Sequence, residues 1–143
     1  MQSIPMTPHD HDRLCDLVDA FRANGTGITR GVDELDELLT HAVLVEENEL
    51  PADVVTMNSQ FLVLDLETGE LRELSVVFPA TADFERGRIS ILAPAGLALL
   101  GRRGGEEVAW HLSTRVHRVL IEAVHYQPEA SGDLARLRAS LGR

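Results

Sequence analysis

Apolar residues recur at helical spacing in two stretches at the start of the chain. The two stripes are Leu14, Leu17, Val18 and Phe21, then Val32, Leu35, Leu38, Leu39 and Ala42. Thr7 and Pro8 are typical of a helix start, because a hydroxyl side chain caps the first turn and proline needs no backbone partner there. The run 24–27, with two glycines, separates the stripes. The pattern predicts an antiparallel helical hairpin, a short coiled coil, over residues 1–46.

Beyond a polar linker at 46–51, the period of the pattern becomes that of strands. Strands are predicted at 54–57, 61–66, 71–78, near 89–91, from 108 and at 118–126, with a tight hairpin turn at 67–70. Pro94, followed by helix formers at 97–100, predicts one short helix that Gly101 ends. We therefore expect an α+β fold, with a mostly antiparallel β-domain over residues 50–130. Residues 131–143 would form a C-terminal tail, in which Leu134, Leu137 and Leu141 could line one side of a short helix.

Charge divides the chain into two unequal parts. The net charge is −10; residues 1–50 hold 11 acids and 3 arginines, giving −8, and residues 51–143 hold 12 acids and 10 arginines, giving −2. The acidic first part argues against direct binding of DNA or RNA, which needs basic surface. The single cysteine, Cys15, excludes an internal disulfide. No apolar run approaches 18 residues and no signal-peptide pattern is present, so we expect a cytoplasmic monomer without membrane contact.

Few residues offer catalytic chemistry. The chain has no Walker loop, no G-x-S-x-G, no paired Cys-x-x-Cys and no H-E-x-x-H, so we expect neither an enzyme nor a cofactor. A short His/Asp tract at 9–12 lacks the remote ligands of a closed metal site. Carboxylates spaced three apart, Asp33 with Asp36 and Glu34 with Glu37, would form an acidic helix face. We favour a solvated outer face as its interpretation.

The segment 89–108 resembles a known family. It reads Ile-Ser-Ile-Leu-Ala-Pro-Ala-Gly-Leu-Ala-Leu-Leu-Gly-Arg-Arg-Gly-Gly-Glu-Glu-Val, and it is similar to the I-S-I-x-S-P-x-G-x-A-L-x-G-K-x-x-G-D-E-V segment of the C-terminal domain of Gre-type transcription factors. The resemblance is closest to the regulator of nucleoside diphosphate kinase branch. That branch also shares the motifs at 51–59, 77–80 and 126–133.

The resemblance implies an FKBP-like β-domain behind the helical hairpin and RNA polymerase as the protein partner. Gre-type factors insert the hairpin into the polymerase secondary channel, where carboxylates at its tip help to hold a metal ion that cleaves the transcript. Here the tip, 24–31, has no Asp or Glu, and the arms are shorter. We therefore expect docking without chemistry, through the corner Leu92, Ala93, Pro94 and Ala95. Two alternatives stay open: a stimulator of transcript cleavage that uses the hairpin carboxylates, and a modulator of nucleoside diphosphate kinase.

Overall fold

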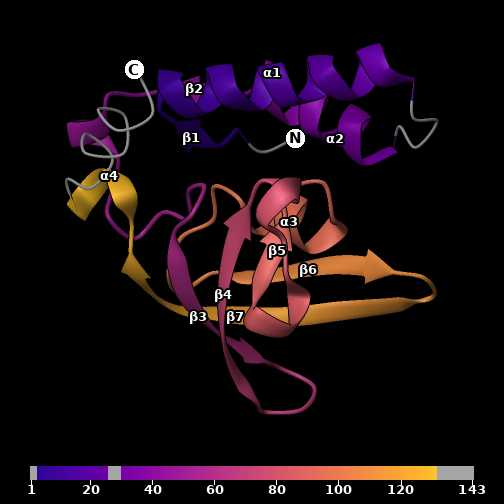
Figure 1. Ribbon diagram of the computed structural model, residues 1–143. Coiled ribbons are helices and arrows are strands. Elements are labelled where there is room, and N and C mark those ends of the chain that lie inside the picture. Colours follow the sequence, from indigo (N-terminus) through magenta and orange to yellow (C-terminus); the bar gives the residue numbers. More distant parts are fainter. Residues whose placement is uncertain (1–2, 26–29, 132–143) are drawn as a thin grey trace.

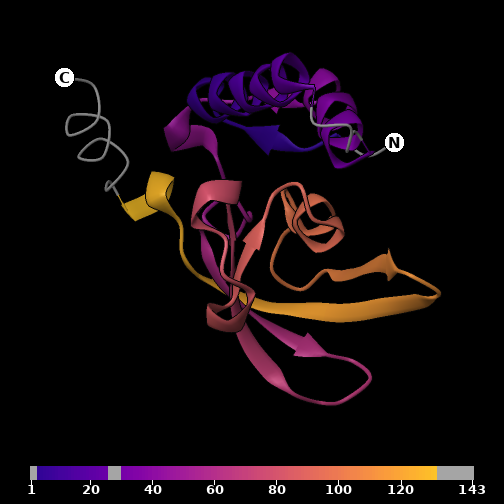
Figure 2. The same ribbon diagram turned by 45° about the vertical axis from the view of Figure 1, so that its right-hand side comes forward.

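The computed structural model describes residues 3–25 and 30–131, and it mixes helices with a curled sheet (Figures 1 and 2). The elements run in the order β1 (Pro5–Met6), α1 (Pro8–Asn24), α2 (Arg30–Thr40), β2 (Val43–Leu44), η1 (Glu47–Glu49), β3 (Gln60–Asp65), β4 (Leu71–Val77), η2 (Pro79–Thr81), η3 (Phe84–Arg86), β5 (Arg88–Ser90), α3 (Pro94–Leu99), β6 (Glu107–Leu112), β7 (Arg115–Tyr126) and α4 (Pro128–Ser131), where η marks a short 3-10 helix. Residues 26–29 and those from 132 onward lie outside the described residues, so the predicted tail helix does too.

Helix α1 begins where the sequence predicts. The Thr7 side-chain oxygen accepts a hydrogen bond from the Asp10 N–H at 3.3 Å, and Pro8 occupies the first turn. Gly25 ends the helix at φ 58°, a left-handed conformation that glycine adopts without steric cost.

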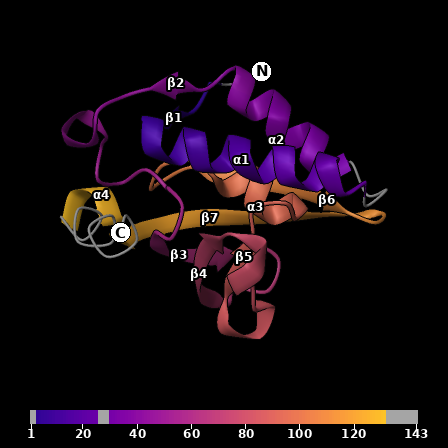
Figure 3. The same cartoon turned by 45° about the horizontal axis from the view of Figure 1, so that its top comes forward.

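Helices α1 and α2 lie side by side and run in opposite directions. His11, near the start of α1, donates from Nε2 to the Leu39 carbonyl at 3.1 Å, while Arg22, near the end of α1, pairs with Asp33 and Asp36 of α2. The predicted antiparallel pairing is therefore present. Figures 1 and 3 place the helical pair on the same side of the sheet as α3.

The helical pair shares its apolar core with the sheet. Buried side chains of both helices belong to one cluster with buried residues of β3, β4, β5 and β7: Leu14, Val18, Val32, Leu35 and Leu39 from the helices, and Phe61, Val63, Val76, Ile89 and Ile121 from the strands. Burial of large apolar side chains stabilises a fold by roughly 1.5–3 kcal/mol each, so this shared cluster holds the hairpin to the β-domain. A parallel pair, β1 with β2, joins the bases of the two arms.

The main sheet has the strand order β5-β4-β3-β7-β6. Its neighbours are antiparallel except β4 and β5, which are parallel. The predicted hairpin around 67–70 is confirmed as the β3–β4 connection. The strand predicted at 54–57 is wrong: Val54 forms only an isolated bridge to Arg103. The β-branched residues of this segment reflect burial rather than strand formation. Val54 and Val55 are completely buried in a loop that packs against the chain after α3.

Two motifs of the sequence meet in space. The Gln127 side-chain amide donates to the carbonyls of Pro51 at 2.7 Å and Val54 at 2.9 Å. Thr56 donates to the buried carboxylate of Glu129 at 2.8 Å, so the 2.7 Å bond between Thr56 and Ser59 must be donated by the Ser59 hydroxyl. Gln127 and Glu129 of the second motif thus fasten the end of β7 to the loop before β3.

Among the described residues, no helix is long and apolar enough to cross a bilayer.

Candidate functional site

The predicted docking corner connects β5 to α3. The Ala93 N–H donates to the Ser90 carbonyl at 3.0 Å, and the Leu92 N–H donates to the Ser90 hydroxyl at 3.1 Å. Ala93 precedes the helix in an extended conformation and gives no side-chain cap, and Pro94 follows at the first helical position. Pro94 is exposed, and Leu92, Ala93 and Ala95 are half-buried.

Gly96 makes this corner tight. A Cβ at this position would collide with the Ser90 carbonyl oxygen and lie 3.0 Å from the Ile91 Cα. Helix α3 can therefore lie directly on the end of β5 only because residue 96 has no side chain. The Pro-x-Gly spacing of the sequence motif has a steric cause, and it gives the corner a fixed shape.

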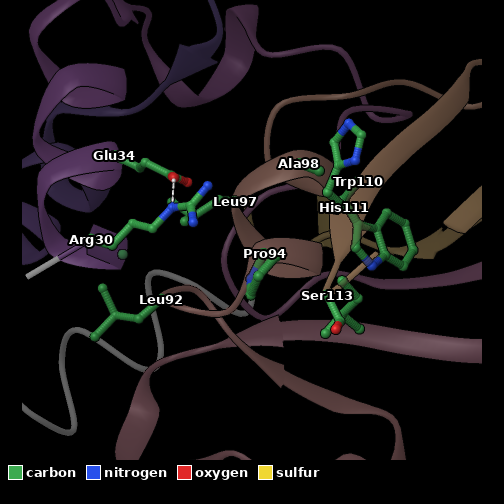
Figure 4. A pocket seen from close by; sticks show the side chains of 11 residues that line it. Arg30, Glu34, Leu92, Pro94, Leu97, Ala98, Trp110, His111 and Ser113 are labelled. Atoms are coloured by element: carbon green, nitrogen blue, oxygen red, sulfur yellow. Dashed lines mark hydrogen bonds and ion pairs between the residues drawn. The ribbon is translucent and has the colours of Figure 1, made fainter. Parts of the chain in front are cut away.

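A groove of about 630 Å³ surrounds the corner (Figure 4). Its floor is Leu92, Pro94, Leu97 and Ala98. One wall is the first turn of α2 and the other is the end of β6 with the turn that follows; the wall residues are Arg30, Gly31 and Glu34 on α2 and Trp110, His111, Leu112 and Ser113 on the β side. A second hollow of about 320 Å³ shares Glu34, Leu97 and Ala98 and continues to Leu38 and Arg102. Together we call them the α2–α3 groove.

Helix α2 touches the corner through its backbone. A Cβ on Gly31 would lie 2.5 Å from the Leu92 carbonyl oxygen. Ordinary contact of a Cβ begins near 3.4 Å, so no larger residue fits without movement. The hairpin and the corner are therefore in direct steric contact.

The four carboxylates of the predicted acidic face all have partners within the hairpin. Arg22 pairs with Asp33 at 3.0 Å and with Asp36 at 2.9 Å. These hydrogen bonds, that to Asp33 first and that to Asp36 second, raise the pKa of the Arg22 guanidinium above its usual range. Arg30 lies 3.2 Å from Glu34, and His41 lies 4.0 Å from Glu37. All four side chains are about half-exposed, Glu34 also lines the groove, and Asp33 and Asp36 are bound to one cation already.

The cysteine and the histidine tract give no reactive centre. Since the His11 Nε2 atom donates to Leu39, its Nδ1 atom is the acceptor that faces the Cys15 sulfur at 3.7 Å. Burial, followed by the negative charges of Asp19 and Asp12, raises the pKa of the Cys15 thiol, which lowers its thiolate fraction. In the part of the chain that the structure describes, no three His, Cys, Asp or Glu side chains are grouped to hold a metal ion.

Sequence reasoning placed Glu34, Leu92 and Pro94 in the candidate site but missed the other residues of the groove, Gly31 and Trp110 among them. Gly31 follows the first residue of α2, where glycine reads as part of a loop rather than as a contact. Trp110 is the single tryptophan of the chain, and its half-exposed position is the signal that only the structure supplies.

An antiparallel helix pair on a curled sheet, with a tight proline corner before the short helix α3, defines a class of small proteins that mix helices and strands. Residues 50–126 match the family model of the C-terminal domain of transcription elongation factor GreA/GreB. The chain therefore belongs to the GreA/GreB family, which confirms the resemblance seen in the sequence.

The relatives include both a regulator of nucleoside diphosphate kinase and transcription elongation factors. The chain is 41% identical over 103 residues to the regulator of nucleoside diphosphate kinase of Escherichia coli K12, covering 71% of this chain and 75% of the relative. It is 38% identical over 86 residues to transcription elongation factor GreA of Clostridium beijerinckii, covering 59% of this chain and 54% of that protein. The solved structure of a prokaryotic GreA/GreB factor from Nitrosomonas europaea superposes with a TM-score of 0.73 at 36% identity, covering 87% of this chain and all of that chain.

Proposed function

We propose that this protein is a non-catalytic transcription regulator that binds bacterial RNA polymerase at the mouth of the secondary channel and competes there with other channel-binding factors. The observation that carries the proposal is the exposed Pro94 on a sterically fixed corner, within a domain of the GreA/GreB family. In the same proposal the β-domain is FKBP-like, the helical pair is a short coiled coil, and the protein acts as a cytoplasmic monomer.

The hairpin supports docking better than metal delivery. A carboxylate that helps to hold a catalytic Mg²⁺ must offer its oxygens to the ion. One oxygen of each of Asp33 and Asp36 accepts a hydrogen bond from Arg22 instead. A short hairpin with paired charges at the channel mouth acts by occupying space, and it excludes other factors from the same entrance.

Retention on immobilised core RNA polymerase tests the proposal. Wild type should be retained at low salt, and Pro94→Arg should lose most binding because the arginine places a charge and a longer side chain on the contact. Pro79→Arg makes the same change at the first position of η2, outside the groove lining, and should bind as wild type. Failure of the wild-type chain to bind, or equal binding of both variants, would contradict the proposal.

Competition and cleavage assays separate the regulatory function from transcript cleavage. The protein should displace a known secondary-channel factor from polymerase. Stalled elongation complexes should release no short 3′ fragments above background. Cleavage that disappears in the double variant Asp33→Ala with Asp36→Ala would instead support the cleavage-stimulating alternative.

A second candidate function follows from the regulator of nucleoside diphosphate kinase, to which the chain is 41% identical. The protein would then modulate that kinase by direct contact. Co-purification with nucleoside diphosphate kinase at micromolar concentration would favour it, whereas separate elution on a sizing column would exclude a stable complex.

A further inference from the structure

Strand β2 carries an exposed apolar edge. Four apolar residues follow one another from Ala42 to Val45, and of these Val43 is 51% and Leu44 50% exposed. The strand belongs to a sheet of two strands, in which β1 is its single neighbour among the described strands. Two-stranded sheets are marginally stable, and an uncharged apolar edge readily adds a further strand. An occupant of this edge would therefore complete the small sheet at the base of the hairpin.

The backbone groups along this edge alternate in direction. The N–H groups of Val43 and Val45 donate to the carbonyls of the first strand and the residue before it, so the N–H and carbonyl of Leu44 point away from β1. At the ends of the edge two groups are already used, because the Ala42 N–H donates to the last turn of α2 and the Glu46 carbonyl accepts from η1. The open side thus offers both groups of Leu44, the Glu46 N–H and the Ala42 carbonyl.

These four groups are complementary to themselves. If a second copy runs antiparallel with Leu44 opposite Leu44, the N–H and carbonyl of each Leu44 bond to those of the other, and each Glu46 N–H faces an Ala42 carbonyl. Every donor then has an acceptor, and neither of the groups already used is needed. A register shifted by two residues would set Leu44 against Ala42 or Glu46, each of which has one group used already.

Charge favours the same arrangement. Antiparallel pairing at Leu44 places His41 of each copy beside the acids at 46–47 of the other, and it keeps the acids of the two copies at opposite ends of the pair. The His41 side chain is 52% exposed, and its contact with Glu37 is long at 4.0 Å, so the ring can turn to a second carboxylate. Glu46 precedes η1 without a side-chain capping bond. A donor therefore meets acceptors at both ends of the pair.

We propose that β2 pairs with β2 of a second copy of this chain, antiparallel about a two-fold axis at Leu44, which joins the two small sheets into one of four strands. The inference goes beyond the proposed function. Strand β2 follows the last turn of α2, whereas the proline corner meets the first turn through Gly31 (Figure 3). The pairing surface and the proposed polymerase contact therefore lie at opposite ends of α2. The monomer stays the form proposed to act on polymerase, and the dimer is a form of the free protein at higher concentration.

Sedimentation of the full-length protein from micromolar to submillimolar concentration tests the pairing. Wild type should form a dimer whose share rises with concentration. Leu44→Lys should weaken the dimer about tenfold or more, because two like charges then face each other across the axis. Leu71→Lys makes the same change at a leucine that is 57% exposed on β4, remote from β2 in Figure 1, and should leave the dimer unchanged. His41→Glu should also weaken the dimer, whereas His111→Glu on β6 should not.

A cysteine at the axis tests the register. Opposed residues of a hydrogen-bonded antiparallel pair have Cα atoms about 5.5 Å apart, a separation that a disulfide can span. In a Cys15→Ser background, Leu44→Cys should form a covalent dimer under mild oxidation. Leu71→Cys in the same background should remain monomeric under these conditions.

Each outcome decides the proposal. Wild type that stays monomeric over the whole range overturns it, whatever else covers the edge. A dimer that survives Leu44→Lys overturns it too, because another surface then joins the copies. If Leu44→Lys fails to fold by circular dichroism, cross-linking of Leu44→Cys decides. Retention on core RNA polymerase separates the two proposals: a monomeric wild type that is retained refutes only the pairing, and a dimeric wild type that is not retained refutes only the polymerase contact.

Discussion

The contact between Gly31 and Leu92 gives the sharpest test of how the hairpin is held. In Gly31→Ala the new Cβ would lie 2.5 Å from the Leu92 carbonyl oxygen, about 0.9 Å inside the 3.4 Å at which ordinary contact begins. The obstacle is backbone of the corner, which the hydrogen bonds to Ser90 hold in place. Helix α2 must therefore move away from the corner.

The expected loss of stability follows from two opposing effects. Forcing extra atoms into a packed contact costs about 1–3 kcal/mol. Alanine recovers up to about 1 kcal/mol over glycine in a helix, and less near a helix end. The free energy of unfolding should therefore fall by about 1–2 kcal/mol, and for a chain of this length the melting temperature should fall by about 3–6 °C.

Thermal and urea unfolding followed by far-ultraviolet circular dichroism measure this change. Gly104→Ala is the matched control, because its Cβ would meet nothing closer than the Asp53 Cβ at 3.9 Å and its φ is not positive. The control should stay within about 0.5 kcal/mol of wild type. Equal stability of the two variants would show that α2 does not rest on the corner, and the steric argument would be wrong.

Three further predictions concern single groups. Hydrogen bonds from the backbone N–H groups of Glu67, the larger effect, and Thr68 lower the pKa of Asp65. Asp65→Asn should therefore unfold at lower urea concentration than wild type at pH 7. The difference in stability should vanish as the pH falls through the lowered pKa, because these bonds stabilise the charged carboxylate only. Cys15, whose pKa is raised, should react with iodoacetamide at pH 8 more slowly than free cysteine. A faster reaction would contradict the raised pKa of this thiol. Thr56→Val should cost about 1.5–3 kcal/mol in urea unfolding, because the buried Glu129 carboxylate loses its donor; Thr56→Ser, which keeps the hydroxyl, should lose less.

The features that depend on residues close together in the chain were predictable from the sequence. The cap at Thr7, the stop at Gly25 and the β3–β4 turn depend on neighbours in the chain, and each was predictable from residue type. The proline corner was also predictable, since Pro94 at a helix start and Gly96 two residues later act on adjacent backbone.

Contacts between distant segments were not predictable. The buried loop at 54–57 has the composition of a strand, and only its packing shows that it pairs at a single bridge. The pairing of Arg22 with Asp33 and Asp36 depends on the angle at which two helices meet. The groove depends on Gly31 resting on Leu92, a contact between segments on different sides of the predicted linker, so no periodicity could indicate it.

The short parallel pair β1–β2 makes Pro5 and Met6 part of the hairpin. The Val43 N–H donates to the Ile4 carbonyl and the Val45 N–H to the Met6 carbonyl, each at 2.9 Å. Ile4 also packs against Gly101, where φ is 82° and a Cβ would collide with its side chain. Anyone who trims the protein for expression, or fuses a rigid tag directly to Ile4, would unfasten the base of both helical arms. If a shortened protein fails to bind a partner, the cause would then be a helical hairpin that has lost its attachment, not the loss of a residue that contacts the partner.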